Sequence, residues 1–275
     1  MTEVDKRTNE HDLETPDSIQ VRFCISYVES RPAEAIAALS MPMERFRNPF
    51  TGAPTVGPLA ILVDAAAGIV NHYRRRPGQW TVSSELSMDL SLDGIGDLDG
   101  PVLATAHALG PLGATSLGIC TLSYRGMVIG GGRVRSFFID TDDVVPQQRP
   151  ETLRRSAETT FADLMAAHIA DSGAAPVLAQ RVDGNLNNDI DILHGGVAAA
   201  GLELAASAAV NRDRADGLLQ TASVRVNFLR PFFAGTASRY EGTPLRVGRN
   251  TAVGDAQAIG DDGKVAITAR VTAYR

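Results

Sequence analysis

The sequence is short of cysteine, of positive charge and of long apolar runs, and each shortage excludes a class of protein. Two cysteines in 275 residues cannot build a disulfide framework. Cys24 and Cys120 stand in the apolar stretches RFCISYV and LGICTLSY, without metal-ligand spacing. We therefore expect two buried thiols and no metal site.

Lysine and arginine total 26 residues against 32 acidic residues, a net charge of −6. Nucleic acid and anionic membrane surfaces both require a basic face, so neither is an expected partner. No apolar stretch reaches the about 20 residues of a membrane span. The opening MTEVDKRTNEHDLETPDS is polar and lacks the apolar core of a signal peptide, so we expect a cytoplasmic protein.

Three familiar functional motifs are also missing. There is no G-x-S-x-G nucleophile turn. DGIGDLDG (93–100) has acidic spacing but no glutamate at the position that a calcium loop needs. GGGR (130–133) does not open a helix, so it does not form a phosphate loop.

The chain is long enough for two domains at about 150 residues each. A polar, proline-containing stretch at 140–155 divides it. We predict a flexible tail at 1–20, a first unit at 21–145 and a second unit at 146–275. The apolar spacing within 151–173 predicts an amphipathic helix at the start of the second unit.

The two halves repeat one pattern, shifted by 139 residues. Residues 46–73 predict a loop and an apolar helix that holds Asp64, and 185–211 predict the same with Glu203. Alternating strands follow each helix, beginning with VSSELSMDLSL and TASVRVNFLRP. A helix that is apolar on most faces must be buried all round, so we expect an α+β fold in which antiparallel sheet curls around each helix.

The second half carries a more specific pattern: Asn188, the turn His194-Gly195-Gly196, Glu203 nine residues after the histidine, and TASVRVNFLRP. This order resembles the hotdog-fold acyl-CoA thioesterases of the phenylacetate-pathway type. The first half has TVG in place of HGG. The resemblance implies a double hotdog, an acyl-CoA thioesterase with coenzyme A as part of the substrate and no other cofactor, and leaves room for a homo-oligomer.

Helix geometry predicts how the carboxylates are used. Nine residues rotate a helix by about 900°, so Glu203 lies half a turn out of phase with its own glycine turn, and Asp64 likewise. If the carboxylates are functional, each must meet the turn of the other half. One site combines a second-half turn with first-half groups: Asp64, Asn188, His194, Gly195, Gly196, and Ser83 or Ser84. The other combines Glu203, Thr221, Asn48, Val56 and Gly57.

The chemistry expected at the first site is thioester hydrolysis. The Gly195 or Gly196 N–H, at a helix N-terminus, would stabilise the oxyanion. Asp64 would act as general base or as nucleophile. Asn188 would orient the water or the thioester, and the serine would hold the carboxylate. The basic groups expected to meet the coenzyme phosphates are Arg74, Arg75, Arg76, Arg246 and Arg249.

Alternative interpretations remain open. The glycines are also typical of a tight turn before a helix, and the carboxylates of interface residues that pair with arginine. The altered first-half turn fits a non-catalytic protein that binds an acyl thioester. Asp189 and His194 have the spacing of an enoyl-CoA hydratase dyad, although the intervening Asn-Pro of that family is replaced by Asp191 and Ile192.

Overall fold

The computed structural model describes residues 18–44, 46–95, 97–141, 149–170, 175–214 and 217–275. Its α-helices are α1 (Ile19–Arg22), α2 (Gly57–His72), α3 (Phe161–Leu164) and α4 (Gly195–Asn211). The first-half strands are β1 (Ser26–Arg31), β2 (Ile36–Glu44), β3 (Gln79–Leu90), β4 (Asp99–Leu109), β5 (Thr115–Tyr124) and β6 (Met127–Asp140). The second-half strands are β7 (Ala167–Ile169), β8 (Val177–Gln180), β9 (Gln220–Phe228), β10 (Arg239–Val247), β11 (Thr251–Ile259) and β12 (Val265–Tyr274).

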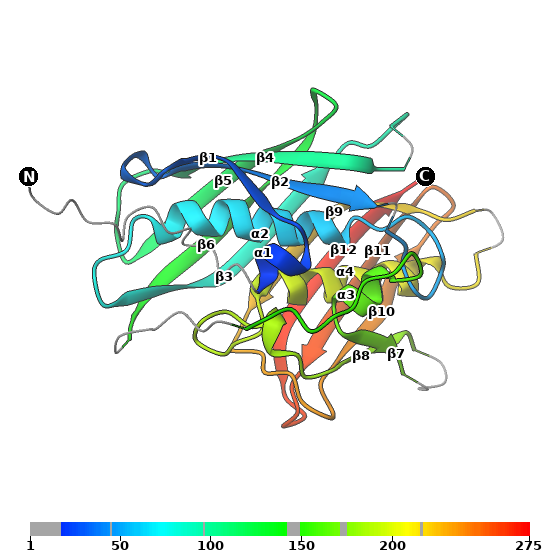
Figure 1. Cartoon of the computed structure of the whole chain (residues 1–275). Helices are drawn as coiled ribbons and strands as arrows, with labels where there is room; N and C mark the ends of the chain where they lie inside the picture. The colour runs from blue at the N-terminus through cyan, green and yellow to red at the C-terminus, as the bar shows by residue number, and fades with distance from the viewer. Residues whose placement is uncertain (1–17, 45, 96, 142–148, 171–174, 215–216) are drawn as a thin grey trace, which may run out of the picture.

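The described strands form one antiparallel sheet in the order β1-β2-β4-β5-β6-β3-β9-β12-β11-β10-β8-β7. The two halves join where β3 pairs with β9, with Glu85 opposite Asn227. The sheet wraps around α2 and α4, which lie beside each other in the centre (Figure 1). This is the α+β double-hotdog arrangement that the sequence predicted.

Small residues allow the sheet to approach both helices. A Cβ atom built on Gly118 of β5 would lie 2.0 Å from the Ala67 carbonyl oxygen of α2. A Cβ atom on Gly242 of β10 would lie 2.0 Å from the Ala205 carbonyl oxygen of α4. Only glycine is accommodated at such contacts, so the strands lie directly on the helix backbones.

The burial of the two central helices is nearly complete. Every residue of α2 is buried except Gly68, and every residue of α4 is buried except Gly195. An apolar helix enclosed in this way is stabilised mainly by removal of its surface from water. The two exceptions therefore mark places where the packing opens.

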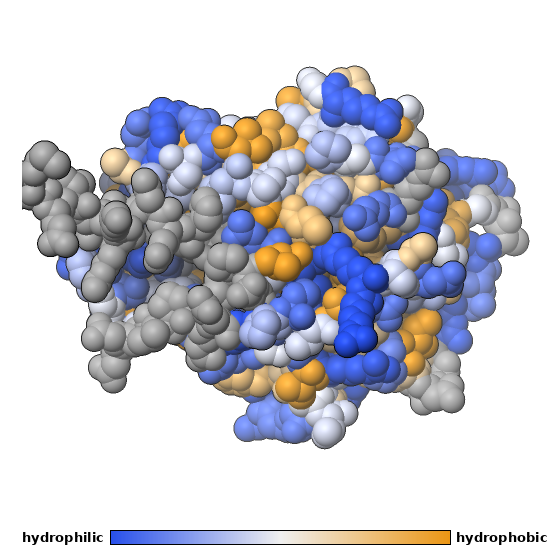
Figure 2. Space-filling model, viewed as in Figure 1, coloured by the Kyte–Doolittle hydropathy of each residue, from blue (hydrophilic) through white to orange (hydrophobic). Residues whose placement is uncertain are grey.

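The outer surface is different. On the face shown in Figure 2, hydrophilic residues cover most of the described surface and hydrophobic residues stand in small separate patches. None of the helices in the described residues is long and apolar enough to span a membrane.

The prediction of a helix across 151–173 is wrong for most of that range. Thr160 and Asp163 form a capping box that begins α3, but α3 ends at Leu164. Ala166 then adopts a left-handed φ of 49°, and β7 follows, paired with β8. The apolar residues of this stretch pack from a turn and a short strand, and their spacing alone does not distinguish this arrangement from a helix.

Two smaller predictions also need correction. Cys24 is exposed, at a left-handed φ of 52°, whereas Cys120 is buried as expected. Of the predicted flexible tail, residues 1–17 lie outside the described part, but Ser18 and Ile19 are buried. The predicted boundary at 145/146 also lies outside the described residues.

Candidate active site

Asp64 stands in the middle of α2 and is held from both halves of the chain. Its side chain is only 6% exposed. The Gly196 N–H donates to Oδ2 over 2.6 Å, and the Ser83 hydroxyl donates to Oδ1 over 3.2 Å. Gly196 belongs to the first turn of α4, so the structure places Asp64 at the turn of the opposite half. Orphan N–H groups and the dipole at a helix N-terminus stabilise an anion there.

His194 is the N-cap of α4 and lies beside the carboxylate. Its Nδ1 is 3.4 Å from Asp64 Oδ2 and accepts from the Gly196 N–H over 3.2 Å. An accepting Nδ1 carries no proton, which assigns the neutral tautomer with its proton on Nε2. Burial lowers the pKa of His194, although Asp64 opposes the shift. His194 therefore acts as a neutral cap at neutral pH.

Gly195 and Gly196 have different tasks in the structure. The Gly196 N–H is already used by Asp64. Gly195 is half-buried, lines the adjacent cavity and is the first residue of α4. Its N–H is one of the donors that a helix N-terminus leaves without an intrahelical partner. Of the two predicted oxyanion donors, Gly195 is the one free to face a ligand.

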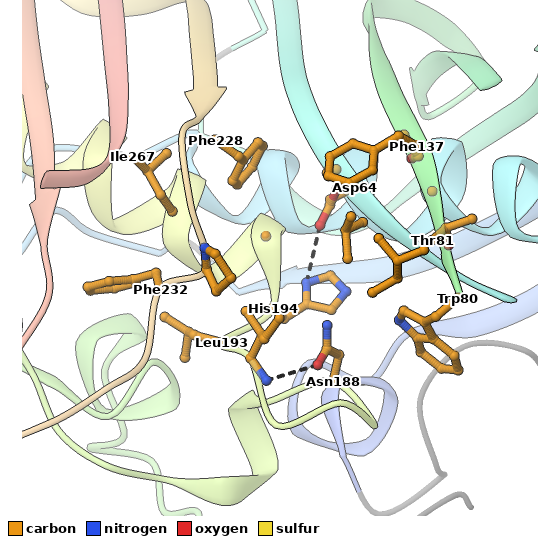
Figure 3. Close-up of a pocket in the computed structure, with 18 of the residues that line it drawn as sticks. Asp64, Trp80, Thr81, Phe137, Asn188, Leu193, His194, Phe228, Phe232 and Ile267 are labelled. Carbon is orange, nitrogen blue, oxygen red and sulfur yellow. Dashed lines mark hydrogen bonds and ion pairs between the residues drawn. The ribbon is translucent and has the colours of Figure 1, made fainter. Parts of the chain in front are cut away.

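A cavity of about 410 Å³ opens beside Asp64 and His194. Figure 3 shows its residues on two sides of this pair. One side, here called the α2 arm, includes Gly68, His72, Trp80, Thr81, Val82 and Phe137. The other side, here called the β9 arm, includes Leu193, Phe228, Leu229, Arg230, Phe232 and Ile267. An apolar cavity with a few convergent polar groups is typical of a small-molecule site.

Asn188 lies on the cavity wall, in the loop that leads to α4. Its Oδ1 accepts from the Ile190 N–H over 3.2 Å and from the Ile192 N–H over 3.0 Å. These bonds fix the loop and turn the amide nitrogen toward His194, as Figure 3 shows. The Nδ2 group is thus presented to the cavity as a donor.

The sequence could not choose between Ser83 and Ser84, and the structure separates them. A register shift between Ser83 and Glu85 disrupts the pairing of β3 with β6. Ser83 faces Asp64, whereas the Ser84 hydroxyl donates to the Arg135 carbonyl over 3.2 Å. Ser84 is therefore not part of this site.

The second predicted site is packed closed. The Thr55 hydroxyl donates to Glu203 Oε2 over 2.6 Å, and the Thr221 hydroxyl donates to Oε1 over 2.7 Å. Burial raises the pKa of Glu203, although these hydrogen bonds oppose the shift. Glu203 is 1% exposed and does not line the cavity beside Asp64.

Neighbouring groups fill the space where a ligand would meet Glu203. A Cβ atom built on Gly57 would lie 3.2 Å from Cε1 of Phe161, whose ring packs 5.1 Å from that of Phe46. The Asn48 amide donates to the Leu204 carbonyl and to Ser207 Oγ. Thr221, Asn48 and the Val56–Gly57 turn therefore surround Glu203 as packing partners.

None of the five predicted coenzyme-binding arginines lines the cavity. Arg74 donates to Ser116 Oγ and to the Gly110 carbonyl, and Arg75 donates to the His72 carbonyl. Arg76 follows them, and Arg246 and Arg249 belong to the β10–β11 region of the second half. Their role toward coenzyme A stays a prediction.

Sequence reasoning missed most of the cavity wall, including Gly68, His72, Trp80, Thr81 and Arg230. His72 and Gly68 could have been found, because they follow Asp64 at i+8 and i+4 on one face of the helix. The cavity positions of Trp80, Thr81 and Arg230 arise because β3 and β9 cease to pair beyond Glu85 and Asn227. No local sequence pattern shows this.

Comparison with known proteins bears on the fold and on the family of the second half. Residues 185–274 match the family model of the acyl-CoA thioesterase N-terminal domain. No curated protein matches the sequence. A solved TesB protein of Mycobacterium avium subspecies paratuberculosis has a TM-score of 0.62 at 12% identity, over 90% of this chain and 95% of its own.

Two further solved structures have the same fold. Acyl-CoA thioesterase II TesB2 of Mycobacterium marinum has a TM-score of 0.59 at 11% identity, over 94% of this chain and 97% of its own. An acyl-ACP thioesterase of Bacteroides thetaiotaomicron has a TM-score of 0.52 at 11% identity, over 89% of this chain and all of its own. At such identities the likeness shows the fold alone.

The fold defines a double-hotdog protein. The family match over residues 185–274 agrees with the predicted resemblance to the hotdog-fold acyl-CoA thioesterases and with the predicted enzyme class, thioester hydrolase.

Proposed function

We propose that this chain hydrolyses an acyl-CoA thioester to the free acid and coenzyme A at the composite site around Asp64. One observation carries the proposal: a carboxylate on α2 receives the Gly196 N–H from the start of α4, on the wall of a largely apolar cavity. The cavity supplies space for an acyl group, and the two helices supply the polar groups that the reaction needs.

The thioester carbonyl is placed against the N-terminus of α4. The Gly195 N–H donates to the carbonyl oxygen and stabilises the negative charge that develops there, a contribution of about 10²–10³ in rate for one such donor. A side chain would obstruct this approach, since a Cβ atom on Gly195 would lie 2.8 Å from Asp64 Oδ2. Asn188 Nδ2 supports the same carbonyl or the attacking water.

Asp64 has room to act on a water molecule. A carboxylate has about four acceptor positions, and two are taken by Gly196 and Ser83. As general base, Asp64 takes a proton from the water that attacks the carbonyl carbon. The carbon–sulfur bond then breaks, and the thiolate of coenzyme A takes the proton from Asp64.

The alternative course is nucleophilic. Asp64 attacks the carbonyl carbon, the thiolate leaves, and water hydrolyses the resulting anhydride. Hydroxylamine distinguishes the two courses, because it intercepts the anhydride as an acyl hydroxamate or as a modified Asp64 and finds no such intermediate if Asp64 is the base. Label in the Asp64 carboxylate after a single turnover in ¹⁸O-labelled water also identifies the nucleophilic course, with water attacking Cγ of Asp64.

We assign hydrolysis to the Asp64 site and a structural role to Glu203. The Glu203 carboxyl is satisfied by Thr55 and Thr221 and enclosed by the packing of Phe161 on Gly57. The hydratase alternative is less well supported, because Asp189 does not line the cavity whereas Asp64 does.

Release of the coenzyme thiol from a panel of acyl-CoA esters tests the proposal. We expect turnover by the wild type and its loss in Asp64→Ala. Turnover that survives Asp64→Ala would contradict the site. Hydration of crotonyl-CoA without hydrolysis would indicate the hydratase, and binding of an acyl-CoA without turnover would indicate a non-catalytic binding protein.

A further inference from the structure

The α2 arm of the cavity ends at a polar pair within otherwise apolar walls. His72 is buried, and its Nδ1 lies 2.8 Å from the Thr81 hydroxyl oxygen. The Trp80 ring stands edge-on to the imidazole, with the centroids 4.6 Å apart. All three residues line the cavity. The reaction around Asp64 does not use this pair, so it requires another explanation.

His72 keeps one ring nitrogen for a ligand. Thr81 engages Nδ1, and among the described residues none hydrogen-bonds Nε2. Burial, together with the charge of Arg75, lowers the pKa of His72 to about 3, so the ring is neutral at physiological pH. A neutral imidazole has one donor and one acceptor nitrogen. Nε2 is the donor if Thr81 donates to Nδ1, and the acceptor if Nδ1 donates to Thr81.

The separation of His72 from Asp64 along α2 sets the length of the acyl group that can extend from the carboxylate to the histidine. Asp64, Gly68 and His72 follow at i, i+4 and i+8 on the face of α2 that lines the arm. Eight residues correspond to about 12 Å along a helix. A Cβ atom built on Gly68 would have nothing within 4 Å, so the arm is open between the carboxylate and the histidine.

The charges indicate which arm receives the acyl group. Arg230 lines the β9 arm; the Val265 and Lys264 carbonyls and the Asp262 carboxylate take up its Nε and Nη2 atoms and leave Nη1 for the phosphates of coenzyme A. The α2 arm has a neutral histidine, and neither Arg74 nor Arg75 lines it. The uncharged acyl group therefore belongs in the α2 arm.

We infer that the preferred substrates are acyl-CoA esters whose acyl group extends along Gly68 and ends in a hydroxyl that hydrogen-bonds His72. A hydroxyl both donates and accepts, so it matches either tautomer of the His72–Thr81 pair. A purely apolar end would leave the buried imidazole nitrogen without a partner, which is unfavourable. This inference rests on the proposed hydrolase function and identifies its substrate class.

Matched substrate pairs test the inference. We would measure kcat/KM for hydroxyl-terminated and unsubstituted acyl-CoA esters of six, eight and ten carbons. At the chain length that reaches His72, the wild type should prefer the hydroxylated ester by about tenfold, the value of one additional hydrogen bond. His72→Phe and Thr81→Val should each reduce this ratio toward one.

Control variants separate the hydrogen bond from general effects. His107→Phe and Thr121→Val make the same substitutions at exposed positions of β4 and β5, and should keep the preference. Gly68→Leu fills the arm and should reduce kcat/KM for the longest esters most. If His72→Phe does not fold, Thr81→Val still tests the pair.

The outcomes are distinct from those of the hydrolase proposal. Loss of the preference in both pair variants supports the inference. Three results overturn the inference and leave the hydrolase function intact. The wild type shows no hydroxyl preference, or the preference survives in both pair variants. In the third, His72→Phe and Thr81→Val change KM equally for the hydroxylated and the unsubstituted ester. No hydrolysis of any acyl-CoA by the wild type overturns the function, and the inference with it.

Discussion

The Gly196 N–H and the Asp64 carboxylate, 132 residues apart in the chain, meet over 2.6 Å at the contact between the two central helices. The first turn of α4 thus completes a site whose carboxylate belongs to α2. A tandem chain positions both parts without association of separate subunits, as a symmetric dimer would require. Under the proposed function, the closeness of the two helices therefore serves the reaction as well as the packing.

Gly196→Ala should be strongly disruptive. Its Cβ atom would lie 2.7 Å from Ile61 Cα and 3.0 Å from Asp64 Cβ, so α4 must move away from α2. We expect a loss of about 1–3 kcal/mol in the free energy of unfolding, as for other overpacked cores. Urea unfolding measures it, together with the loss of thioester hydrolysis.

Gly68→Ala is the matched control, because its Cβ atom would have nothing within 4 Å. Removal of a glycine from a helix interior should increase stability by about 0.5–1 kcal/mol. Equal effects of the two substitutions would show that the α2–α4 contact is looser than described.

Glu203→Gln should change how stability depends on pH. Burial raises the folded-state pKa of Glu203 above its ordinary value of 4.5. A raised pKa means that the carboxyl favours folding most below pH 4.5, and that this contribution is lost as pH rises through the folded pKa. The stability of the wild type relative to Glu203→Gln should therefore fall from pH 4 to pH 8. A constant difference in urea unfolding would contradict the burial of an ionisable Glu203.

Arg22 should be a strong contributor to stability. Its guanidinium is fully buried, contacts Glu151 over 2.7 Å and Asp183 over 3.0 Å, and donates to the Leu164 carbonyl. Arg22→Met leaves these groups without their cation, and we expect a loss of about 3–5 kcal/mol. Arg225→Met removes an exposed pair with Asp89 and should cost no more than about 1 kcal/mol.

The same cluster predicts an acid-sensitive contribution. Although burial alone would raise it, the pKa of Glu151 is lowered by its hydrogen bond to Arg22. The contribution of the pair is therefore present above pH 4.5 and is lost as pH falls through the lowered pKa. In Arg22→Met this pH-dependent part should be absent from the unfolding curves.

The sequence predicted the arrangement of the carboxylates because helix geometry is rigid. Nine residues of α4 cannot bring Glu203 back to the Gly196 turn, so the carboxylate that meets this turn had to come from the other half. The repeat then identified Asp64 as that carboxylate. Periodicity failed at Phe161–Leu164, where the left-handed Ala166 and the pairing of β7 with β8 override it.

Other parts of the site depend on tertiary contacts that no local pattern encodes. Ser83 and Ser84 differ only through a register shift in β3. Phe161 packs on Gly57 from the segment between the halves and helps to close the second site, although the carboxylate of that site is retained. Arg230 reaches the cavity because β9 ends at Phe228.

The most direct test of the account compares two isosteric changes in one assay, Asp64→Asn and Glu203→Gln, with kcat/KM for the best acyl-CoA ester as the readout. Loss of a general base should reduce the rate of Asp64→Asn by about 10²–10⁴, while Glu203→Gln stays within threefold of the wild type. A larger loss in Glu203→Gln than in Asp64→Asn would contradict the account and move the chemistry to the other half of the chain.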